Sequence, residues 1–152
     1  MPLPNIFDPN VAADVVGRIN KLTPTTQPKW GKMTVGQMLA HCCVTYEMLY
    51  DNNHPAPKGF MKFILKAFIK GVVVGEKPYK HNSRTAPAFL ITTEKEFNTE
   101  KERLINYIKR TQQLGGTHFH NKESLSFGKL STTEWNNMFY KHLNHHLSQF
   151  GV

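Results

Sequence analysis

The sequence has few cysteines, no long uninterrupted apolar run and no recognisable export signal. Its only two cysteines, Cys42 and Cys43, are adjacent, a spacing at which an ordinary disulfide is sterically awkward, so a reducing compartment is favoured. The longest apolar stretch, residues 60–74, is interrupted by lysines, whereas a membrane-spanning helix needs about 20 consecutive apolar residues. The first residues carry neither the basic nor the apolar segment of a signal peptide. We therefore expect a cytoplasmic protein without a membrane span.

Acidic residues are fewer than basic residues, and the formal net charge is +8. Clustered Lys and Arg side chains would indicate nucleic-acid binding, because they release counterions from phosphate groups. Here the basic residues are scattered through 58–80 and 95–110, and in the second range they alternate with glutamates, as on a solvated helix face. The charge pattern therefore argues against a nucleic-acid partner.

The length of 152 residues fits one domain with one core, covering residues 1–152. Apolar residues recur at helical spacing in four long segments, near residues 9–22, 34–51, 93–114 and 131–150. These periods predict an all-α fold, a four-helix bundle with one short accessory amphipathic helix. Bundles of this kind commonly build cofactor sites from side chains on facing helices.

The ends of the long helices carry recognisable signals. Asp8-Pro9 has the form of an N-cap followed by proline at the first helical position. Residues 34–37 and 131–134 both have the form of a capping box, and Gly115-Gly116 predicts the end of the third helix. Residues 75–89 are expected to form an ordered connection that crosses the fold, and residues 117–129 a loop.

The accessory helix is expected over residues 60–74, where lysines recur every four residues opposite Phe60, Ile64 and Phe68. Such a helix can pack on the bundle with its lysines in water, or it can lie in a membrane interface. Because cationic solvated faces are common, the sequence favours the packed helix and argues against peripheral membrane contact.

Histidines in the last helix form the most informative pattern. His142 and His146 are four residues apart, so they share one face of the helix, and helical-wheel positions turn both toward the core. His145 falls at the rim of the apolar face. In the second helix, the same counting places His41 at the edge of the inward face, beside Thr45.

Three imidazoles in one core need either separate hydrogen-bond acceptors or a single metal ion that satisfies them together, and the metal is the simpler explanation. The candidate ions are Zn²⁺, Ni²⁺, Fe²⁺ and Mn²⁺, and Cu²⁺ also suits neutral histidines. Three protein ligands would leave one position for water or substrate, as in catalytic zinc sites. A single histidine on an apolar helix face is, by contrast, usually a hydrogen-bonded core residue.

The sequence leaves the reaction open. A metal-dependent transferase or hydrolase is one hypothesis, and a non-catalytic module that binds a metal or small ligand is another. No residue stands out as a general base, because Glu47 lies about 120° away from His41 around the helix.

The pattern resembles the DinB or YfiT-like superfamily, in which a single histidine on helix two and a His-x-x-His-His signature on the last helix bind metal. His41 and His142-Leu-Asn-His145-His146 match these positions, and residues 30–41, 84–87, 127–128 and 134–135 resemble a branch known only as a domain of unknown function. The resemblance implies His41, His142 and His146 as ligands. It leaves His145 in the second shell or at the rim, where Thr45 and Gln149 are also expected.

The resemblance also implies candidate partners. Members of the superfamily include S-transferases and isomerases that use small thiols such as bacillithiol or mycothiol, so a small thiol or another small molecule is the expected substrate. A homodimer is also implied.

Overall fold

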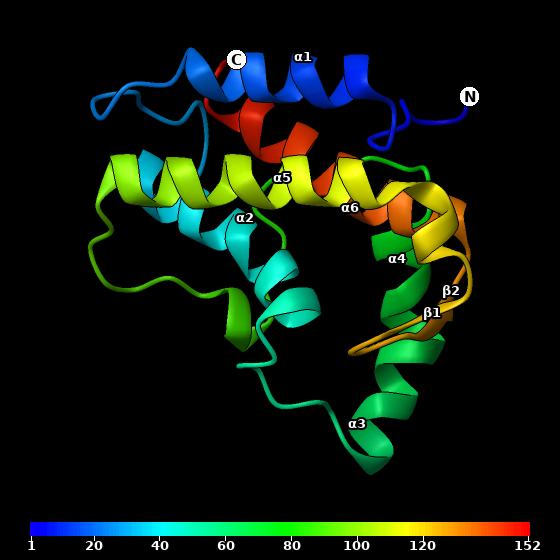
Figure 1. Ribbon diagram of the computed structural model, residues 1–152. Helices are drawn as coiled ribbons and strands as arrows, with labels where there is room; N and C mark the ends of the chain where they lie inside the picture. Colours follow the sequence, from blue (N-terminus) through cyan, green and yellow to red (C-terminus); the bar gives the residue numbers. More distant parts are fainter.

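The computed structural model describes residues 1–152 and is mostly helical, as the sequence predicts (Figure 1). Its four long helices are α1 (Pro9–Asn20), α2 (Val35–Tyr50), α5 (Phe97–Phe119) and α6 (Thr132–Gln149). The shorter elements are α3 (Gly59–Ile64), the π-helical turn η1 (Leu65–Ile69), α4 (Lys70–Val74), the 3₁₀ turn η2 (Pro87–Phe89), and strands β1 (Lys122–Ser124) and β2 (Gly128–Leu130). Helices α5 and α6 each contact α1 and α2, and they contact each other.

The capping signals act where the sequence places them. The Asp8 side chain accepts a hydrogen bond from the Asn10 amide and opens α1, with Pro9 at its first position. Both capping boxes are formed, by Thr34 with Gln37 at α2 and by Ser131 with Glu134 at α6. These caps set where α2 and α6 begin.

Helix α5 differs from the prediction at its start, and it is followed by a segment that was not predicted. It starts at Phe97 rather than Thr93, because the Glu96 carboxylate accepts from two backbone amides and caps the helix there. At the other end, Gly115 has the non-helical angles φ 76° and ψ 164°, so the long helix breaks there, as Gly115-Gly116 predicts, and a further helical segment follows to Phe119. The last turn is retained because Phe119 is fully buried and stacks on Phe7.

The sequence predicted a loop over residues 117–129. The segment after α5 instead contains a small antiparallel hairpin in which Lys122 pairs with Leu130. The Ser124 hydroxyl donates to the Gly128 carbonyl and accepts from the Phe127 amide, so one buried side chain closes the turn. Three-residue strands have too few positions to show alternation in the sequence.

The core is aromatic at its centre. The Phe139 ring stacks on Tyr46 and Trp135, and Phe119 packs against its edge. Cys42 and Cys43 are buried free thiols on α2. Core packing thus joins α2, α5 and α6, the helices that also surround the histidines.

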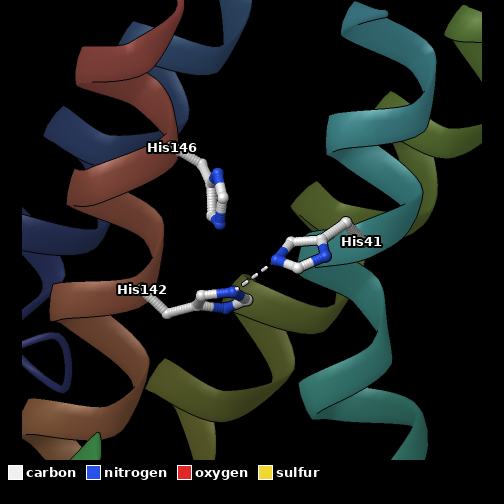
Figure 2. Close-up of side chains that lie close together, drawn as sticks. All are labelled: His41, His142 and His146. Carbon is white, nitrogen blue, oxygen red and sulfur yellow. Dashed lines mark hydrogen bonds between the residues drawn. The ribbon is translucent and has the colours of Figure 1, made fainter. Parts of the chain in front are cut away.

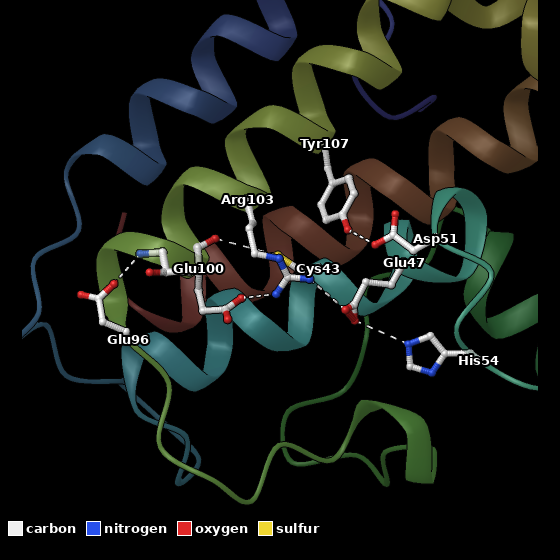
Figure 3. Close-up of polar contacts among 9 residues, drawn as sticks. Cys43, Glu47, Asp51, His54, Glu96, Glu100, Arg103 and Tyr107 are labelled. Atoms are coloured by element: carbon white, nitrogen blue, oxygen red, sulfur yellow. Dashed lines mark hydrogen bonds and ion pairs between the residues drawn. The ribbon is translucent and has the colours of Figure 1, made fainter.

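An ionic cluster joins α2 to α5 on the outer side of their contact (Figure 3). The Arg103 guanidinium reaches the Glu47 carboxylate at 3.0 Å and the Glu100 carboxylate at 2.6 Å. The Tyr107 hydroxyl donates to Asp51, and His54 lies 3.5 Å from Glu47. Glu47 is therefore engaged in this contact.

Residues 59–74 form one continuous rod, the projecting helix, that extends away from the long helices (Figure 1). The expectation that it packs its apolar face on the bundle is wrong: Phe60 is 76% exposed and Phe68 is 70% exposed, and only Val74 is buried. The reason is that the main contact of this rod with α6 is made by α4, and the preceding turns extend beyond it. No helix is long and apolar enough to cross a membrane.

Candidate metal centre

Three histidines from two helices converge on one point (Figure 2). His41 comes from α2, and His142 and His146 come from successive turns of α6. One ring nitrogen of each lies within 4.8 Å of the others. His41 and His146 are buried, and His142 is partly buried.

His41 is oriented by the connection between α4 and α5. Its Nδ1 lies 2.9 Å from the backbone carbonyl of Phe89. A carbonyl oxygen can only accept a hydrogen bond, so Nδ1 carries the proton and Nε2 carries a lone pair. The connection thus fixes the tautomer of a histidine on α2.

His146 is oriented in the same way by Gln149, one turn further along α6. The Gln149 amide nitrogen donates to the Trp30 carbonyl at 2.8 Å, which leaves its oxygen facing His146 Nδ1 at 2.8 Å. The amide oxygen can only accept, so His146 also holds its proton on Nδ1 and presents a lone pair on Nε2.

His142 has a hydrogen-bond partner that can act as either donor or acceptor. Its Nδ1 lies 3.4 Å from the Thr45 hydroxyl, which can either donate or accept, and its Nε2 lies 3.0 Å from His41 Nε2. Without a metal, His142 Nε2 must carry the proton that joins the two rings. With a metal, the proton can move to Nδ1 and be donated to Thr45.

All three rings are held neutral. Burial lowers the pKa of His41, although its bond to Phe89 opposes the shift. Burial and the neighbouring His41 lower the pKa of His146 to about 3. Burial and the other histidines lower the pKa of His142 well below its usual value. Neutral imidazole is the form that binds metal ions.

The donor set fits a divalent transition metal. Three neutral imidazoles meet at one point, and each Nδ1 has an oxygen partner outside the cluster, the arrangement that usually orients metal-binding histidines. Imidazole suits Zn²⁺, Ni²⁺ and Fe²⁺, whereas Mn²⁺ prefers more oxygen ligands. The residues present could therefore bind one metal ion.

A cavity of about 200 Å³ lies along α6, between Tyr140 and Ser148, and none of the three converging histidines lines it. His145 lines it and has its ring 4.9 Å from that of His146. Trp30 stacks on His81 at 3.7 Å, and Tyr79 stands edge-on to His145. The cavity is thus walled by flat rings, one of which, His145, lies beside His146.

No carboxylate hydrogen-bonds to the three histidines. Glu47, on the same helix as His41, is paired with Arg103 and His54 instead. Cys42, next to His41 in sequence, faces the core, and burial raises the pKa of its thiol well above the usual range. Neither residue supplies a base or a nucleophile to this centre.

The sequence selected the three histidines that the structure brings together, and it placed Thr45, His145 and Gln149 near them. The Phe89 and Trp30 carbonyls and the rings of Tyr79 and His81 were missed. A backbone carbonyl leaves no signal in sequence, and all four residues lie in connections without periodicity.

Comparison with known proteins places the chain in a family. The family model of the DinB superfamily matches residues 9–150. Searches of curated proteins and of solved structures gave no significant match. Since the matched region covers nearly the whole chain, this protein belongs to the DinB superfamily.

Proposed function

We propose that this protein binds one divalent metal ion through the Nε2 atoms of His41, His142 and His146. The observation that carries the proposal is the fixed tautomer of His41 and His146, whose lone pairs face the same point. Without a cation, His41 Nε2 is paired only with His142 Nε2, and no protein donor hydrogen-bonds to His146 Nε2. One metal ion would accept the lone pairs of all three rings. Membership of the DinB superfamily supports the same function.

We further propose that the centre is that of a metal-dependent enzyme, either a thiol S-transferase-like enzyme or a hydrolase. Three protein ligands leave a coordination position free for substrate or water. A divalent ion held by these histidines would act as a Lewis acid, which would lower the pKa of bound water to near neutrality or hold a bound thiol as its thiolate. The cavity of about 200 Å³ is smaller than usual ligand pockets, so a small substrate fits best.

In this function the residues around the histidines are positioning residues. The Phe89 carbonyl, Thr45 and Gln149 hold the three rings in the orientation that directs Nε2 inward. Trp30 and Tyr79 provide flat apolar walls against which a small substrate can pack. These groups come from α2, α6 and the connections before α2 and after α4, as expected if the chain is a single domain that folds as a four-helix bundle.

The absence of a carboxylate near the histidines favours a second candidate, a non-catalytic module that binds a metal or a small ligand. A protein of that kind needs the ligands and the orienting bonds but no general base. Its metal would bind anions or thiols without turning over a substrate.

Metal content tests the first proposal. The protein, purified without a polyhistidine tag, should contain about one metal ion per chain by plasma mass spectrometry, or acquire it on incubation with Zn²⁺, Ni²⁺, Fe²⁺ or Mn²⁺. His41→Ala and His142→Ala should both lose it. His118→Ala, at an exposed position on α5, is the matched control and should retain it. A wild-type protein that takes up none of these ions would overturn the proposal.

Turnover separates the enzyme from the binding module. The metal-loaded protein is assayed with small thiols against a panel of electrophiles and with a panel of esters. Thiol-dependent product formation that is lost in His142→Ala supports the transferase, and ester cleavage supports the hydrolase. A metal that binds thiol without any turnover supports the module.

A further inference from the structure

The projecting helix concentrates the exposed apolar surface of the molecule. Phe60, Phe63 and Phe68 are 76%, 62% and 70% exposed, and Met61, Ile69 and Val72 on the same helix are also exposed. Phe60 and Phe63 stack on each other, so two neighbouring rings form one aromatic surface near the tip. Contiguous exposed apolar surface of this kind usually marks a contact with another molecule or a membrane.

Polar bonds fasten the C-terminal half of this helix to the rest of the fold. The Asn137 amide donates to the Val74 carbonyl, and the buried Lys141 ammonium donates to the Val72 and Gly75 carbonyls. The first turns lie beyond these bonds and project from the long helices (Figure 1). The apolar side chains of those turns therefore remain available for an external contact.

The two lysines nearer the C-terminal end of the helix are turned toward the protein. Lys70 pairs with Glu134 on α6 at 3.0 Å, and the Lys66 ammonium lies beside Gly128 of the hairpin. The π-helical turn at 65–69 advances each residue by a smaller angle than an α-turn, which keeps Phe68 closer to the direction of Phe60. The helix is amphipathic, with its aromatic side outward and its lysines along the flank.

The positive charge of the projecting helix and the residues before it indicates what kind of partner it can bind. Residues 52–75 contain four lysines and no acidic residue, and three of them, Lys58, Lys62 and Lys66, have no carboxylate partner. A second copy packed on the same face would bring two sets of these lysines together, because a two-fold interface places the same patch on both subunits. An anionic surface is complementary to both the apolar side chains and the lysines.

We propose that the projecting helix binds the interface of an anionic lipid bilayer. Phe60, Phe63 and Phe68 enter the boundary between headgroups and acyl chains, and Lys58 and Lys62 meet the lipid phosphates with their alkyl stems along the apolar surface. The contact is peripheral, since the helix is too short and too interrupted to span a bilayer. It is independent of the proposed metal site.

Co-sedimentation with vesicles tests the proposal. The full chain should pellet with vesicles of phosphatidylcholine containing phosphatidylserine, and much less with phosphatidylcholine alone. Lys58→Gln with Lys62→Gln should weaken this binding by roughly 25-fold, because each lysine near an anionic surface contributes about fivefold. Lys21→Gln with Lys109→Gln removes the same charge from exposed positions elsewhere and should have a much smaller effect.

The apolar contribution is tested by replacing Phe60, Phe63 and Phe68 together with Ser. Since these side chains are exposed, the variant should keep the wild-type circular dichroism and metal content while losing vesicle binding. No pelleting of the wild type with anionic vesicles, or equal losses in both lysine pairs, would overturn the proposal. Light scattering that shows a dimer converted to a monomer by the Ser variant, without vesicle binding by the wild type, would assign the surface to self-association instead.

Discussion

Gln149 hydrogen-bonds simultaneously to His146 and to the backbone of Trp30, each at 2.8 Å. The second bond determines the first, because an amide whose nitrogen donates to a carbonyl must turn its oxygen the other way. The loop that holds Trp30 thereby fixes the tautomer of a histidine at the far end of the sequence. This link makes the loop before α2 part of the candidate metal centre.

Replacing Gln149 with Ala should weaken metal binding by about 10- to 100-fold, the usual effect of removing a group that orients a histidine ligand. Competition with a chromogenic chelator measures the change in affinity. Ser148→Ala, at the neighbouring exposed position, is the control and should bind metal as the wild type does. An unchanged affinity in the Gln149 variant would mean that the ring of His146 is held by packing alone.

Gly31→Ala should reduce metal affinity without touching a histidine. A Cβ at position 31 would lie 2.6 Å from Gln149 Nε2, so the amide must move away from the Trp30 carbonyl. The positive φ of 81° adds backbone strain of about 1–2 kcal/mol. Gly59→Ala carries a comparable strain at φ 53° but meets nothing within 4 Å, so it should lower stability and leave metal affinity unchanged.

Arg103→Met should lower the free energy of unfolding by about 1–3 kcal/mol, because it leaves Glu47 and the buried Glu100 without their shared cation. Urea denaturation followed by circular dichroism measures the loss. Lys109→Met, at an exposed position on the same helix, should change stability by less than about 0.5 kcal/mol. Equal effects in the two variants would show that the ionic cluster adds no net stability.

The two thiols should resist alkylation in the folded protein at pH 8 and react quickly in urea. Burial raises the pKa of Cys43 to about 12 and that of Cys42 well above its usual range, so neither forms thiolate in the folded state. Iodoacetamide labelling followed by mass spectrometry measures the rate. Labelling of the folded protein as fast as a free thiol would contradict the buried environment.

The raised pKa values of the two thiols predict that the free energy of unfolding falls as the pH rises above about 9. There the unfolded chain loses thiol protons that the folded chain keeps, so the unfolded state binds fewer protons and the free energy of unfolding decreases. The slope should be at most about 1.4 kcal/mol per pH unit for each thiol. Cys43→Ala should show a shallower decline between pH 9 and 12 than the wild type in urea titrations.

The sequence by itself determined the long helices and the inward direction of their histidines. Asp8, Thr34 and Ser131 act on backbone groups within a few residues, and the spacing of His142 and His146 is a property of one helix. Such local relations are readable because helical geometry converts sequence separation directly into direction. Gly115 shows the limit: the break at this glycine was readable, but the further helical segment that ends at the buried Phe119 was not.

Only the tertiary structure decided what surrounds those elements. His41 donates to the carbonyl of Phe89, 48 residues away in the sequence. His146 donates to Gln149, whose orientation depends on a hydrogen bond to Trp30, 119 residues away. The outward direction of Phe60 and Phe68 depends equally on where α4 meets α6. Backbone carbonyls are chemically identical along the chain, and exposure depends on what the rest of the fold covers, so only the folded structure specifies these features.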